Sequence, residues 1–216
     1  MGITIYFKGQ LENNNMIHTF IEDLTDIAET LNWEYEVLDE DWSKPSTAKL
    51  SQIKNGIEIT GHLSLKGICI NLHPDCESLM FYFNSKGILT TPISTILVNE
   101  KQIKKENAYN SVKTQFAPPD IHITIIKLLK FLKRRYIHDL NVVDEGEYWE
   151  SEDKKKLIKK LNQINDAMNR IEKILSDLDV EHIQQCSSEQ LAKILEDRLK
   201  EDLKNERSAG TTPERT

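Results

Sequence analysis

Residues 68–90 read ICINLHPDCESLMFYFNSKGILT. Within this stretch, residues 68–72 and 79–83 are short apolar segments rich in β-branched and aromatic side chains, which is typical of β-strands. Residues 85–87 have the composition of a turn, and a third apolar segment follows at residues 88–90. Strands that follow one another at such short spacing favour antiparallel pairing. The stretch therefore predicts an antiparallel meander.

The flanking segments predict two helices and four further strands. Residues 3–7 and 140–143 have strand composition, and residues 33–37 and 57–60 alternate apolar and polar side chains as half-buried strands do, whereas residues 42–55 are polar and predict a loop. Apolar residues recur at steps of three and four in residues 17–31 and again in residues 121–137, which indicates amphipathic helices. We therefore expect an α+β domain over residues 1–150, with an antiparallel-rich sheet covered by two helices.

The C-terminal part has a different pattern. A helix predicted to begin near Ser151 carries apolar residues at successive spacings of 4, 3, 4, 3, 4 and 3, which is the heptad repeat of a coiled coil. These positions are the candidate interface: Leu157, Leu161, Ile164, Met168, Ile171, Leu175 and Leu178. Ser187 and Gln190 predict a capping box that opens a second helix.

Residues 151–206 therefore predict a helical hairpin or coiled-coil arm, and residues 207–216 a disordered tail. Two arrangements of the heptad helix stay open. It packs against the second helix of the same chain, or against the same helix of a second chain in a homodimer.

Composition excludes several classes of protein. The chain has 216 residues, with 28 basic and 35 acidic side chains and a net charge of −7. No apolar run approaches the ~18 residues of a membrane-spanning helix, and the N-terminal residues lack the features of a signal peptide. The three cysteines match no zinc or redox spacing. We therefore expect a cytoplasmic protein without a membrane segment.

The signs of charge are segregated along the chain. Residues 9–43 contain ten acidic residues and no Lys or Arg, whereas residues 101–135 contain nine basic and two acidic residues. These stretches predict complementary surfaces within the fold, a self-complementary oligomer, a local basic patch for an anionic ligand, or solvated helix faces. A net acidic chain has no overall attraction to nucleic acid. Any such contact would fall to the basic residues Lys127, Lys130, Lys133, Arg134 and Arg135.

Three segments carry a resemblance to a known group of sequences: residues 1–6, 112–116 and 143–150. The chain resembles a family of uncharacterised bacterial proteins that begin M-G-x-T-I-x-Y, carry K-T-Q before a Leu-rich helix, and have D-E-G-x-Y-W-E before a terminal helix. The resemblance covers most of residues 1–180. It implies an intact, cytoplasmic bacterial domain and no particular activity.

The densest polar cluster lies at residues 144–150, where four carboxylates follow a predicted strand. Asp144 and Glu145 could bind Mg²⁺ or Mn²⁺, or act as acid and base. The alternative is an acidic helix N-terminus with Trp149 as a packing anchor. The aromatic ring of Trp149 also leaves ligand stacking open.

A second cluster precedes the predicted helix over residues 121–137. Lys113 and Gln115 could contact an anion there, and His122, one turn into the helix, could join them. Pro118 and Pro119 remove two of the backbone donors that such a site would use. The candidate ligand-binding residues are therefore Lys113, Gln115, His122, Asp144, Glu145 and Trp149.

A third segment, residues 73–77, contains His, Asp, Cys and Glu. His73 and Cys76 could act as base and nucleophile, but side chains this close along a turn seldom converge. The chain lacks a Gly-rich phosphate loop, a G-x-S-x-G elbow and an H-E-x-x-H motif. We therefore expect no cofactor and no resident metal.

The first hypothesis for function is a non-enzymatic binding or assembly protein that uses its C-terminal arm to contact a second copy or a protein partner. The alternative is a metal-dependent hydrolase acting on phosphate esters, with Asp144, Glu145 and His73 or His122 as ligands and Lys113 as the anion contact. A third reading is an acidic immunity or antitoxin-like protein that masks a basic partner.

Overall fold

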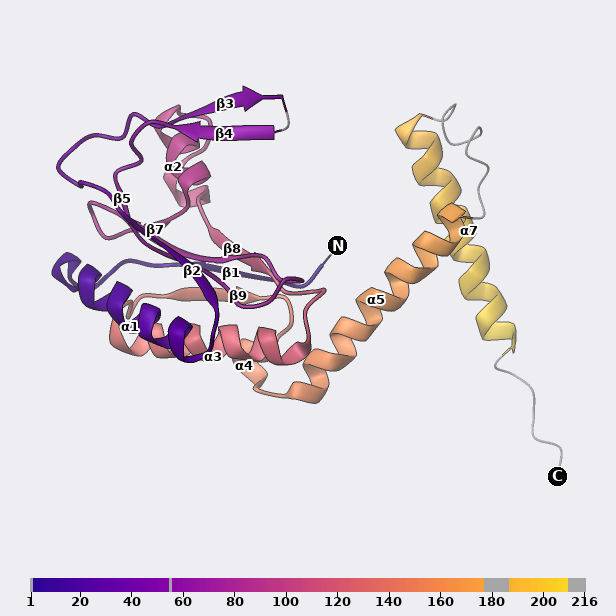
Figure 1. Cartoon of the computed structure of the whole chain (residues 1–216). Helices are drawn as coiled ribbons and strands as arrows, with labels where there is room; N and C mark the ends of the chain where they lie inside the picture. The colour runs from indigo at the N-terminus through magenta and orange to yellow at the C-terminus, as the bar shows by residue number, and fades with distance from the viewer. Residues whose placement is uncertain (1, 55, 177–186, 210–216) are drawn as a thin grey trace. The chain divides into compact units, whose positions relative to one another are not determined.

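The computed structural model describes residues 2–54, 56–176 and 187–209, with no side chain described at Glu106 or at residues 201–209. The chain divides into two compact units, residues 1–161 and residues 162–216. The first unit is an α+β domain (Figure 1). Its strands are β1 (Thr4–Lys8), β2 (Glu34–Asp39), β3 (Lys49–Ile53), β4 (Gly56–Thr60), β5 (Leu65–Asn71), β6 (Leu79–Asn84), β7 (Leu89–Thr90), β8 (Asn110–Lys113) and β9 (Asn141–Asp144). Its helices are α1 (Ile17–Thr30), α2 (Pro92–Asn99), α3 (Pro119–Arg135) and α4 (Tyr148–Ser151).

The predicted meander is confirmed. Strands β2, β5, β6 and β7 form one antiparallel sheet in that order, with Ile68 opposite Phe81 in the β5–β6 pair. Gly67 allows these two strands to approach closely. It has φ +151°, and an added Cβ there would lie 1.9 Å from the carbonyl oxygen of Phe81. The structure therefore requires glycine at this position of the sheet.

A second antiparallel sheet has the order β8-β1-β9, so the first strand of the chain pairs with two later strands. An isolated bridge between Gln10 and Ile88 links this sheet to the meander, supported by a 3.0 Å hydrogen bond from the Leu89 amide to the Gly9 carbonyl oxygen.

The prediction of a loop over residues 42–55 is wrong in its second half. Strand β3 lies there and pairs with β4 as a separate hairpin.

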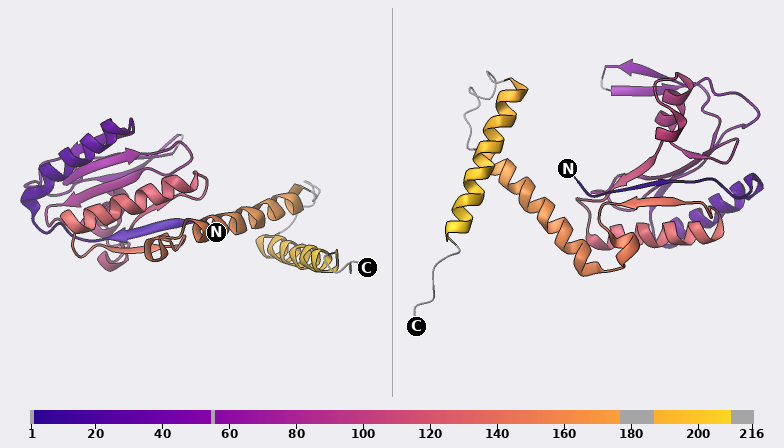
Figure 2. Two further views of the ribbon diagram at one scale, coloured as in Figure 1. Left: turned by 90° about the horizontal axis from the view of Figure 1, so that it is seen from below. Right: turned by 180° about the vertical axis from the view of Figure 1, so that it is seen from behind.

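The two predicted helices, α1 and α3, lie on the same face of the sheets (Figures 1 and 2). Phe20 of α1 is fully buried, with its ring centroid 5.1 Å from that of Phe83 and 5.2 Å from that of Tyr136. On α3, Ile125 and Leu129 join the same core. The aromatic and aliphatic side chains that the 3.6-residue period placed on one face are therefore the ones that cover the sheet.

The first unit extends to Leu161, eleven residues past the expected boundary at residue 150. Leu157 and Leu161 lie on α5 (Lys154–Ser176) and are 0% and 4% exposed, because the first turns of this helix pack into the domain. The N-cap predicted at Ser151 is instead Asp153, whose Oδ1 accepts a 2.8 Å hydrogen bond from the Lys155 amide.

The capping box predicted at the second C-terminal helix is confirmed. The Ser187 amide donates to Gln190 Oε1 at 2.8 Å, and the Gln190 amide donates to Ser187 Oγ at 3.3 Å. This helix, α7 (Ser188–Ala209), continues past residue 206, where the arm was expected to end. Residues 210–216 of the predicted tail, and Leu178 of the heptad, lie outside the described residues.

Candidate functional site

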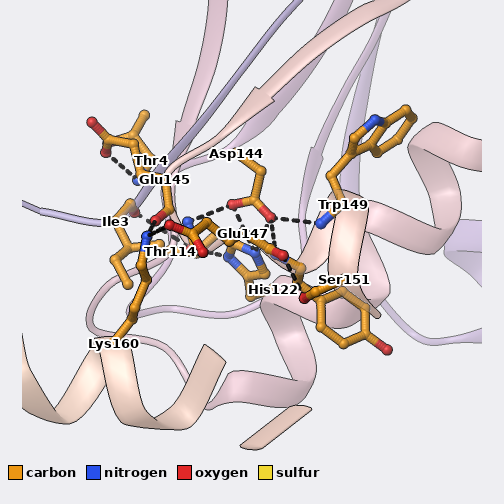
Figure 3. A network of polar contacts seen from close by, with 12 residues as sticks. Ile3, Thr4, Thr114, His122, Asp144, Glu145, Glu147, Trp149, Ser151 and Lys160 are labelled. Atoms are coloured by element: carbon orange, nitrogen blue, oxygen red, sulfur yellow. Dashed lines mark hydrogen bonds and ion pairs between the residues drawn. The ribbon is translucent and has the colours of Figure 1, made fainter. Parts of the chain in front are cut away.

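Asp144 is the centre of the cluster predicted at residues 144–150. It ends strand β9, opposite Ile5 of β1, and its residue is 6% exposed. Its Oδ1 accepts a 2.7 Å hydrogen bond from the Gly146 amide, and its Oδ2 accepts from the amides of Tyr148 at 2.7 Å and Trp149 at 2.9 Å (Figure 3). The carboxylate therefore satisfies the free amides at the start of α4.

His122 lies between Asp144 and Thr114 and is fully buried. Its Nε2 is 3.1 Å from Asp144 Oδ1 and 3.2 Å from Oδ2, and its Nδ1 is 2.7 Å from Thr114 Oγ1. An ionised carboxylate only accepts hydrogen bonds, so the Nε2 proton of His122 points to Asp144. The Thr114 hydroxyl is the hydrogen-bond partner of the other ring nitrogen, Nδ1.

Two opposing effects set the pKa of Asp144. Burial alone would raise the pKa of this carboxyl, but the hydrogen bond and charge of His122, together with the amides of Trp149 and Gly146, lower it below its ordinary value. Asp144 is therefore ionised at neutral pH, and each hydrogen bond that it accepts is charge-assisted.

The predicted residues Lys113, Gln115 and Glu145 lie around this network. Gln115 is 2% exposed, and an added Cβ at Gly2 would lie 2.6 Å from Gln115 Oε1 and 2.7 Å from Lys113 Cε. Glu145 Oε2 accepts a 2.8 Å hydrogen bond from the Thr4 amide. Thr114, between Lys113 and Gln115, was missed as a site residue because nothing in its local sequence marks its hydroxyl as buried.

Trp149 acts as a packing anchor. The ammonium groups of Lys130 and Lys133 lie 5.5 Å and 5.9 Å from the centroid of its ring.

Arg135 Nε lies 3.0 Å from Asp23 Oδ2, which joins the basic end of α3 to the acidic α1. Three of the five basic residues predicted as a nucleic-acid surface are thus engaged within the fold, so the two charged stretches are partly complementary.

The geometry at residues 73–77 does not favour a nucleophile. Burial, with a smaller contribution from Glu77, raises the pKa of the Cys76 thiol to about 11, so a protonated thiol predominates at neutral pH. His73 Nδ1 accepts the Asp75 amide at 3.1 Å, which is a local turn contact. Over residues 2–54, 56–176 and 187–209, no three His, Cys, Asp or Glu side chains are grouped as metal ligands.

The buried network of Asp144, His122 and Thr114 holds parts of the fold together. Asp144 accepts from three amides and His122, both ring nitrogens of His122 are hydrogen-bonded, and neither side chain is open to a substrate. The network ties β9, α3 and α4 to Thr114, which follows β8. We therefore interpret it as a polar clamp within the core.

Comparison with known protein families, with curated proteins and with solved structures finds no match. The resemblance to the bacterial family therefore stays a hypothesis. In the described part of the chain, none of the helices is long and apolar enough to cross a membrane.

Proposed function

We propose that this protein is a non-enzymatic assembly protein whose C-terminal helices associate with those of a second copy. The supporting observation is the exposure of their apolar faces. Among residues 162–176 and 187–200, whose side chains are described, none is fully buried. The large apolar residues that are half-buried or exposed are Ile164, Met168, Ile171, Ile174 and Leu175 of α5, and Leu191, Ile194, Leu195 and Leu199 of α7.

The exposure of the heptad positions changes along α5. Leu157 and Leu161 are buried by the domain, whereas Met168, on the same seam, is 38% exposed. An amphipathic helix in water gains most of its stability from covering its apolar face. The seam beyond Leu161 is therefore only partly covered within the described chain, and a partner that buries it further would stabilise it.

Several features favour a second copy as that partner. A repeat of 3.5 residues keeps an apolar seam directed toward a similarly supercoiled helix. The positions that flank the seam beyond Leu161 are Asn165, Ala167, Glu172 and Ile174, of which one is charged. Two identical helices therefore bring few like charges together, and a symmetric pair would cover both seams at once.

The test is the mass of the full chain in solution, by light scattering over a wide range of protein concentration. We expect a dimer, and we expect Ile171→Lys to shift it toward the monomer because it places a charge in the seam. Asn169→Lys adds the same charge next to the seam and is the matched control, which should remain dimeric. A wild-type monomer at every concentration would overturn the proposal, as would equal masses for the two variants.

The hydrolase alternative has less support from the geometry. Its proposed metal ligands Asp144 and His122 are already hydrogen-bonded to each other, and Asp144 also accepts three amides. A metal would have to displace these bonds. A monomer that copurifies with a basic protein would instead support the immunity or antitoxin-like reading.

A further inference from the structure

A pocket of about 710 Å³ opens in the first unit, away from the buried polar network. Its walls come from the end of β1, the loop over residues 42–46, the turn between β6 and β7, and the C-terminal half of α2. These segments are far apart in the sequence, so no local motif marks the pocket. Its volume lies within the range of roughly 300–1,000 Å³ that is typical of small-molecule sites.

The pocket is cationic on an acidic protein. Its lining includes Lys8, Lys44, Lys86 and Lys105, and Asp139 is the one carboxylate among the lining residues that the structure describes. Asp139 Oδ1 already accepts a 2.9 Å hydrogen bond from the backbone amide of residue 10. An anion in the pocket would therefore meet several ammonium groups and one partly satisfied carboxylate.

Two of the four lysines are already engaged. Lys44 Nζ is 3.5 Å from Asp41 Oδ2, and Lys8 Nζ is 5.3 Å from the centroid of the Tyr109 ring. Lys86 and Lys105 form no ion pair with any side chain that the structure describes. These two ammonium groups are the ones most available to a ligand.

The rest of the lining combines apolar side chains with a similar number of uncharged polar ones. The Trp42 indole is held in place by a 3.2 Å hydrogen bond from its Nε1 to the Phe83 carbonyl oxygen. Leu63 and Leu89 also line the pocket. Ser46 Oγ is buried without a hydrogen-bond partner among the described residues. A buried hydroxyl without a partner is costly, and a polar ligand atom could satisfy it.

We propose that this pocket binds a small organic anion, in which an apolar ring system carries a phosphate, sulfonate or carboxylate group. The ring would pack against the apolar lining that includes Trp42, and the anionic group would be held by Lys86 and Lys105. Apolar side chains that pack against a ligand and polar groups that fix its orientation are the two components of a ligand site. The inference is independent of the proposed assembly, since none of these residues lies on α5 or α7.

The test uses the fluorescent aromatic sulfonate anilinonaphthalene sulfonate, with its uncharged analogue phenylnaphthylamine as the comparison probe. We expect saturable one-to-one binding of the sulfonate, weakened about tenfold in the double variant Lys86→Gln/Lys105→Gln. Lys127→Gln removes an exposed lysine of α3 outside the pocket and should leave binding unchanged. The uncharged probe should not distinguish the double variant from the wild type.

A second variant separates the pocket from other apolar surfaces. Asn99→Trp places a large side chain on the lining while retaining all four lysines, and it should abolish binding of the sulfonate. Thermal melts and circular dichroism establish that each variant is folded. Absence of saturable binding, equal affinity in the double variant and Lys127→Gln, or unchanged binding in Asn99→Trp would each overturn the proposal.

Discussion

Residues 1–161 and residues 162–209 differ in how far their apolar side chains are buried. In the first region, apolar side chains of two sheets and two helices meet in a common core, and even the polar Asp144 and His122 are buried with their hydrogen bonds satisfied. In the second, the part of α5 that follows Leu161 and the helix α7 contain no fully buried side chain among those described. Periodicity shows which face of a helix must be covered, but it does not show what covers it.

The largest expected effect comes from breaking the polar clamp of the first region. Asp144→Ala leaves His122 Nε2 and three backbone amides without their acceptor in a buried site. We expect a loss of about 4 kcal/mol in the free energy of unfolding, measured by urea denaturation. Glu145→Ala is the control, because it removes a neighbouring carboxylate that accepts a single amide, and it should cost far less. Equal losses for the two variants would contradict the clamp.

The next effect concerns the close approach of strands in the meander. Gly67→Ala should lower the free energy of unfolding by about 3 kcal/mol, because the added Cβ meets the Phe81 carbonyl oxygen and φ is unfavourable for alanine. Gly56→Ala is a matched control, since Gly56 has a similar φ of +149° but an added Cβ there would have nothing within 4 Å. A Gly67 variant that is no less stable than the Gly56 variant would show that the close approach is unimportant.

The smallest effect is the response to acid. The pKa of Asp144 is lower in the folded chain than its unfolded value of about 3.9, so its contribution to stability is complete well above that value. The contribution is lost as the pH falls through the folded pKa, because the unfolded carboxyl takes up its proton first. Asp144→Asn should therefore flatten the dependence of unfolding free energy on pH below about pH 4 relative to the wild type. An unchanged profile would contradict the assigned ionisation.

Much of the fold could be predicted because its signals are local. The turn at residues 85–87, the helix predicted over residues 121–137 and the capping box at Ser187 each depend on neighbouring residues. The structure contains the turn and the capping box, and it places the helix two residues earlier, at Pro119–Arg135. The hairpin of β3 and β4 was missed at its first strand, because the polar composition of residues 42–55 resembles that of a loop.

The candidate site depends on distant pairings, which the sequence does not display. Four carboxylates in seven residues marked residues 144–150, but which of them is buried follows from the pairing of β9 with β1 at the other end of the chain. The same applies to Thr114, which meets His122 only once α3 is packed, and to the pocket, which draws Lys8 and Lys105 together.

The most direct test of the account is the solution mass of the full chain compared with that of a chain ending at Leu161. The truncation must retain Leu157 and Leu161, because both belong to the core of the first unit. We predict a dimer for the full chain and a folded monomer for the truncated chain. The same number of copies in both, with the truncated chain folded by circular dichroism, would contradict assembly through the C-terminal helices.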